Sequence, residues 1–129
     1  MTATVAQYLT IGVGLWLIGL SVFMLAAPRR ALKALGAMGG TPAVHFGEMA
    51  LRTAAGIALV LAAAPSRFPQ AMALIGGFLV VSALVLMLLP RRWHASYSTW
   101  WAQRIPAIAV RLVAPLSLVA GGVLVWAVL

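Results

Sequence analysis

The chain has 129 residues, of which 64% are hydrophobic and 8% are charged, and it contains no cysteine. So few charged side chains cannot cover the surface of a soluble globule, and without cysteine the chain has neither a disulfide nor a thiolate metal ligand. The net charge of +8 does not indicate nucleic-acid binding, because the basic residues fall mainly at the ends of apolar segments, where anionic lipid head groups are the expected counterions.

Four apolar segments are each close to the ~20 residues that a helix needs to cross a bilayer. The first covers about residues 5–27 and is longer than the core of a signal peptide, so we expect a retained helix. The others cover about residues 44–64, 69–89 and 105–129. The short connectors leave no room for a further folded domain. The sequence predicts one all-α domain over residues 1–129, an integral membrane four-helix bundle.

Two of the three connectors hold three basic residues each, at 29–33 and at 91–104, whereas the connector at 65–70 holds one. By the positive-inside rule, the two basic connectors face the cytoplasm and both termini lie on the opposite side of the cytoplasmic membrane. The tripeptide PRR at 28–30 recurs at 90–92. A duplicated helix hairpin would produce this repeat, but proline and arginine also commonly end membrane helices, and we favour that explanation.

The segment 44–64 follows the glycine-rich stretch GAMGG, which we interpret as a flexible break, with Thr41 or Pro42 opening the helix. One face of the helix carries an alanine at every fourth position from 50 to 62. Such a stripe of small residues predicts the close approach of another helix.

Glu48 is the only acidic residue of the chain and precedes Arg52 by one helical turn, so both lie on one helix face. Arg111, in the segment 105–129, is predicted at similar depth. A carboxylate inside a bilayer requires a partner, which predicts a cluster of Glu48, Arg52 and Arg111. The cluster has three interpretations: ion pairs that fix packing, a docking site whose surplus positive charge binds a lipid phosphate, anionic small molecule or partner carboxylate, or a titrating Glu48 with His45 as proton exchanger.

The segment RRWHASYSTWWAQR between the third and fourth apolar segments predicts a short amphipathic helix in the cytoplasmic head-group layer. Trp93, Tyr97 and Trp100 recur at helical spacing, and His94 and Trp101 complete a predicted interfacial platform. The platform could dock a quinone, a lipid or a partner. The alternative is an irregular anchored connector.

The series HFGEMALR, SRFP and LLPRRWH resembles a group of small four-helix inner-membrane proteins of proteobacteria. An acidic residue followed by a Gly/Ala-rich second helix is also loosely similar to DoxX-like proteins. These resemblances imply a bacterial inner membrane and a compact helical fold, and they bring no activity.

Catalytic constellations are missing from the sequence, because one acid and two histidines provide neither a Ser-His-Asp set nor a pair of carboxylates. The histidines also lack metal-ligand spacing, so we expect no enzyme activity, metal or cofactor. We predict a non-catalytic accessory or assembly subunit that docks a partner protein or an anionic lipid. The alternative is a small oligomeric proton-coupled transporter or channel with Glu48 as coupling residue. Expected partners are anionic lipids and a membrane protein or second copy, without nucleic acid.

Overall fold

The computed structural model describes residues 2–129, with side chains from residue 4 onward. Within these residues all regular structure is helical. The helices are α1 (Thr2–Ala26), α2 (Pro28–Gly36), α3 (Pro42–Ala63), α4 (Pro69–Leu88), α5 (Arg91–Arg104) and α6 (Ala107–Val128). Helices α1, α3, α4 and α6 are long and apolar enough to cross a membrane, which fits a multi-pass membrane protein. Their bounds agree with the four predicted segments to within one helical turn.

Proline marks the start of every helix after α1. Pro28, Pro42 and Pro69 lie in the first turns of α2, α3 and α4, and Pro90 and Pro106 immediately precede α5 and α6. A proline at such a position removes no hydrogen bond from the helix, because the first N–H groups of a helix have no partner within it. The side chain of Thr41 caps α3 by accepting from the N–H of Val44 at 3.1 Å, as the predicted start of this helix requires.

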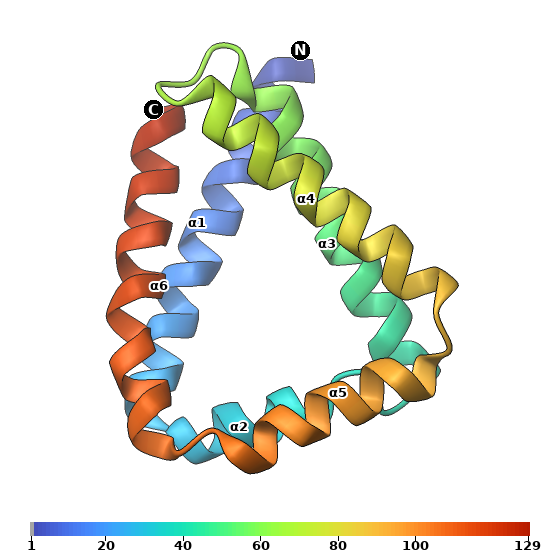
Figure 1. Ribbon diagram of the computed structural model, residues 1–129. Coiled ribbons are helices and arrows are strands. Elements are labelled where there is room, and N and C mark those ends of the chain that lie inside the picture. The colour runs from blue at the N-terminus through green and yellow to red at the C-terminus, as the bar shows by residue number, and fades with distance from the viewer. Residues whose placement is uncertain (1) are drawn as a thin grey trace.

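The four long helices form two antiparallel pairs instead of one compact bundle (Figure 1). α1 packs along α6, α3 packs along α4, and the two pairs meet where α1 contacts α3. They converge at one end of the molecule, the apex, where both ends of the chain lie, and they diverge toward the other end. There α2 and α5 pack together and run across the gap as the base of a triangle.

The length of α5 explains why the bundle does not close. Its 14 residues span about 21 Å at the rise of an α-helix. Packed helices lie only about 8–10 Å apart. Because α5 joins the lower ends of α4 and α6, it holds the two pairs apart at the base.

Each pair crosses at two facing glycines. A Cβ atom added to Gly14 would lie 2.8 Å from the carbonyl oxygen of Gly121, and one added to Gly56 would lie 2.7 Å from that of Gly76. Backbones approach this closely only where neither helix has a side chain. The predicted alanine stripe of α3 contributes in part, since Ala58 and Ala62 are buried and the alanines at 50 and 54 are exposed.

The pair α1 and α6 is also joined by hydrogen bonds between side chains and backbone. Ser21 Oγ donates to the carbonyl of Ala114 at 2.8 Å, and Ser117 Oγ donates to that of Leu17 at 2.8 Å. In a bilayer the hydrophobic effect does not drive apolar helices together, because lipid tails are as apolar as the helices. Hydrogen bonds of this kind therefore help to hold the pair together.

All four long helices contribute to a small buried core at the apex. Its buried members are Ala6, Leu59, Ala62, Ala63, Met72, Ala127 and Val128. Arg67, in the connector between α3 and α4, donates to the carbonyls of Ala127 and Trp126 at 3.0 and 3.1 Å. The apex is therefore closed by packing and by hydrogen bonds.

The segment 36–40, predicted as a flexible break, lies at the base and is hydrogen-bonded to α5. Arg91 NH1 donates to the carbonyls of Gly39 and Gly40 at 2.9 Å each. Gly39 has a φ of 75°, and a Cβ atom there would lie 2.9 Å from the backbone nitrogen of Ala95. Only glycine fits this left-handed, tightly packed position.

The order long helix, short helix, long helix occurs twice, as α1–α2–α3 and as α4–α5–α6, and each half contributes one helix to each pair. A shift of 62 residues takes Gly14 to Gly76 and the first PRR tripeptide to the second. A shift of 65 takes Gly56 to Gly121, because the crossing segment of the second half is three residues longer. The recurring tripeptide thus occupies equivalent positions of the two halves.

Candidate functional site

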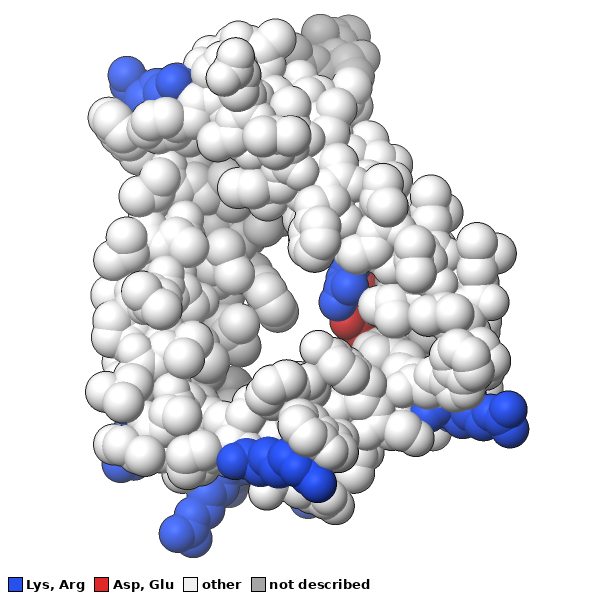
Figure 2. All heavy atoms as spheres, in the orientation of Figure 1, with Lys and Arg blue, Asp and Glu red and all other residues white. Residues whose placement is uncertain are grey.

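An opening passes between the two helix pairs, bounded by the apex at one end and by the base at the other (Figure 2). The red atoms on its wall belong to Glu48, the only acidic residue, and a basic side chain lies beside them. This side chain is Arg52, whose NH2 atom is 2.6 Å from Glu48 Oε1. Their side chains are 28% and 21% exposed, respectively. The predicted pair on one face of α3 is present, and it faces the opening.

Arg52 also links the two helices of its pair. Its NH1 atom donates to Ser82 Oγ on α4 at 3.4 Å, and Ser82 Oγ donates to the carbonyl of Leu79 at 3.0 Å. A guanidinium has five N–H donors. Two of its nitrogens are engaged with Glu48 and Ser82, so donors remain for a ligand in the opening.

Both histidines of the chain lie next to the Glu48–Arg52 ion pair. His45 on α3 is 1% exposed and His94 on α5 is 7% exposed, and their Nδ1 atoms are 2.9 Å apart. The other ring nitrogen of His94, Nε2, is 3.5 Å from Glu48 Oε2, which is buried and has no hydrogen-bond partner. His45, His94, Glu48 and Arg52 form what we call the polar cluster.

The local sequence explains why His94 points inward. His94 and Ser98 are buried one turn apart on α5, whereas Trp93 and Tyr97 are exposed. The turn at Gly39, which Arg91 holds by hydrogen bonds, packs against this part of α5. A Cβ atom added to Gly39 would lie 3.1 Å from His94 Nδ1. The turn thus seats the start of α5 at the polar cluster.

Burial lowers the pKa of His94 below its ordinary value of 6.5. Neighbouring Glu48 raises this pKa, and His45 and Arg52 lower it, but burial has the largest effect. The neutral form of the His94 ring is therefore favoured.

Arg111 does not join the polar cluster, which corrects the predicted set of Glu48, Arg52 and Arg111. It is exposed on α6, where its Nε atom donates to the carbonyl of Leu25 on α1 at 3.3 Å. Among the residues with described side chains, Glu48 forms its ion pair with Arg52, and its other carboxylate oxygen faces His94. Similar depth in the bilayer did not bring Arg111 close, because it belongs to the other helix pair.

The predicted platform on α5 is present as a helical face, without His94. Trp93, Tyr97, Trp100 and Trp101 are all exposed, and the two adjacent tryptophan rings lie edge to face at 4.9 Å. The guanidinium of Arg104 lies 4.1 Å from the ring centre of Trp100.

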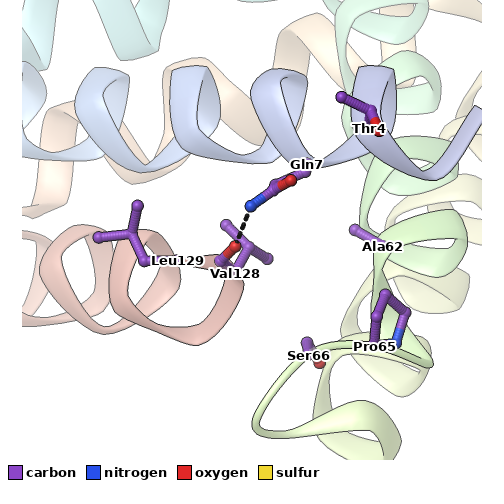
Figure 3. A pocket seen from close by; sticks show the side chains of 7 residues that line it. All are labelled: Thr4, Gln7, Ala62, Pro65, Ser66, Val128 and Leu129. Carbon is purple, nitrogen blue, oxygen red and sulfur yellow. Dashed lines mark hydrogen bonds between the residues drawn. The ribbon is translucent and has the colours of Figure 1, made fainter. Parts of the chain in front are cut away.

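A second concavity lies at the apex, with a volume of about 300 Å³ (Figure 3). It is lined by Thr4, Gln7, Ala62, Pro65, Ser66, Val128 and Leu129. The amide of Gln7 donates to the carbonyl of Val128, so its polar group already has a protein partner. The polar cluster is therefore the stronger candidate site.

The polar cluster can exchange protons and bind an anion through Arg52. In the described part of the chain, no group of three or more histidine, cysteine or acidic side chains is arranged to hold a metal ion. No protein-family model matches the chain, and the comparisons with curated proteins and with solved structures also give no match.

Proposed function

We propose that the chain is a non-catalytic accessory subunit of the bacterial cytoplasmic membrane that holds an anionic lipid in the opening, with the lipid phosphate at Arg52. The observation that carries this proposal is the opening itself, with the Glu48–Arg52 pair on its wall. A space within a bilayer fills with apolar groups, and a charged pair facing it requires a polar ligand.

The shape of the opening favours a lipid over a membrane-spanning helix. The apex core closes one end and the packed helices α2 and α5 close the other, so a helix along the membrane normal cannot pass between the pairs. Acyl chains can enter from the side. Only 17% of the most apolar stretch of each of α1, α4 and α6 is buried, so most of the apolar surface of these helices is open to acyl chains.

The charge distribution favours an anionic lipid. The base carries six basic residues and no acid: Arg29, Arg30, Lys33, Arg91, Arg92 and Arg104. Basic residues near a membrane surface attract anionic lipids by about 1 kcal/mol each. In the proposed orientation the base faces the cytoplasm and both termini lie on the other side.

Native mass spectrometry tests this proposal with protein from nanodiscs that contain equal amounts of phosphatidylglycerol and phosphatidylcholine. We expect wild-type protein to retain phosphatidylglycerol, and Arg52→Gln to reduce the retained fraction at least tenfold. Arg111→Gln is the matched control, because it removes the same charge from the other helix pair. Equal retention of both lipids, or equal loss in the two variants, would overturn the proposal.

A further inference from the structure

We propose that His45 and His94 form a proton relay that delivers protons from the base of the molecule to Glu48 in the opening. The inference goes beyond lipid docking and stands whether or not a lipid occupies the opening. It rests on the order of four polar atoms along the path.

The path alternates donors and acceptors. A neutral imidazole donates from one ring nitrogen and accepts at the other. With the proton of His45 on Nδ1, this atom donates across 2.9 Å to Nδ1 of His94, and the proton of His94 is then on Nε2, which faces Glu48 Oε2 at 3.5 Å. The second gap is longer than a hydrogen bond, so the relay requires the His94 ring and the carboxylate to approach each other. All three side chains then form one directional chain.

Proton transfer along this chain conserves charge at each histidine. A proton enters at His45 Nε2, the Nδ1 proton of His45 passes to His94 Nδ1, and the Nε2 proton of His94 passes to Glu48 Oε2. Both histidines end neutral in the other tautomer, and Glu48 becomes a neutral carboxylic acid. Because burial favours neutral His94, the ring passes a proton on and does not retain the charge.

The result of the transfer is a change of charge in the opening. A neutral Glu48 releases Arg52 from its ion pair, so the wall of the opening changes from balanced to cationic. The charged or polar side chains bonded to this path are Arg52 and, through it, the hydroxyl of Ser82. Helix α4 carries no ionisable side chain, and the exposed groups of α5 are Arg91, Arg92, Tyr97 and Arg104.

The positions equivalent to the three relay residues in the other half of the molecule are apolar. By the shifts of 65 and 62 residues that relate the two halves, the position equivalent to His45 is Val110, that equivalent to Glu48 is Val113, and that equivalent to His94 is Leu32. The two histidines and the carboxylate are therefore a feature of one half of the molecule only.

Time-resolved infrared spectroscopy after a rapid pH drop tests the relay in phosphatidylcholine nanodiscs. Glu48 is the only side-chain carboxyl of the chain, so its carboxylic C=O band is identified by its loss in Glu48→Gln. We expect this band to rise at least tenfold more slowly in His94→Phe and in His45→Phe. Tyr97→Phe, an exposed change on the same helix, is the matched control and leaves the rate unchanged.

His94→Gln serves as a second variant, because an amide preserves a hydrogen bond at this position but cannot relay a proton between two ring nitrogens. A slow rise in His94→Gln, with wild-type circular dichroism, supports the relay even if a phenylalanine variant misfolds. Wild-type rates in His94→Gln would overturn it. Because these nanodiscs contain no anionic lipid, a negative result here leaves the lipid-docking proposal to its own test.

Discussion

Gly76→Ala is expected to weaken the pair of α3 and α4 strongly for so small a change. The new methyl carbon would lie 2.6 Å from the carbonyl oxygen of Gly56, whereas ordinary contacts of this kind begin at 3.4 Å. The nearest atom belongs to backbone and cannot rotate away, so the helices must separate by about 0.8 Å at their crossing. The contacts on both sides of the crossing then loosen together.

Overpacking of a well-packed core costs about 1–3 kcal/mol. Since ~1.4 kcal/mol corresponds to a factor of ten, a cost of about 2 kcal/mol lowers the folding equilibrium constant roughly thirtyfold. The measurement is unfolding in mixed micelles with increasing SDS fraction, followed by circular dichroism. The midpoint of Gly76→Ala should fall clearly below that of the wild type.

Gly77→Ala is the matched control, because a Cβ atom at this neighbouring position meets nothing within 4 Å. Both substitutions add one methyl group to the same helix and bring the same gain in helix propensity. The difference between the two variants therefore isolates the close crossing. If they unfold at the same SDS fraction, the argument that glycine contacts hold the pair together is wrong.

Three further predictions concern the remaining contacts. Burial lowers the pKa of His94 below 6.5, so the contribution of neutral His94 to stability is complete above pH 6.5 and is lost as the pH falls through the pKa of the folded state. The protein should therefore unfold at a lower SDS fraction at about pH 5 than at about pH 7.5. His94→Phe should abolish this contribution to the pH dependence. Ser21→Ala leaves the buried carbonyl of Ala114 without its donor and should cost about 1 kcal/mol in the same assay. Gly39→Ala strains a left-handed backbone and should cost about 1–2 kcal/mol, whereas Gly47→Ala, in open space, should cost nothing; equal midpoints would contradict this reasoning.

The helices could be predicted from the sequence because hydropathy and proline act locally. The four long helices follow the apolar segments, and Thr41 and Pro42 open α3 as predicted. Helix α2 was missed because it has only nine residues, although Arg29, Arg30 and Lys33 lie on one face, as in an amphipathic helix. The arrangement in two pairs could not be predicted, since it depends on which glycines meet and on the span of α5.

The candidate site was predictable only within one helix. The spacing of Glu48 and Arg52 fixes a common face, and this pair is present. Arg111 was misplaced, because depth along a helix fixes neither its rotation nor its partner. His94 was assigned to the platform because helical spacing places it nearly in line with Trp101, and its burial depends on the turn at Gly39 that packs against α5.

The opening has a consequence for how the protein is handled. With α1, α3, α4 and α6 across a bilayer, both mouths of the opening lie in the membrane plane, so its contents exchange by lateral diffusion and not through the aqueous phase. Detergent tails reach the same space during solubilisation. Extraction with a native-nanodisc polymer, which carries the surrounding lipids along, is therefore the preparation that preserves the occupant acquired in the cell.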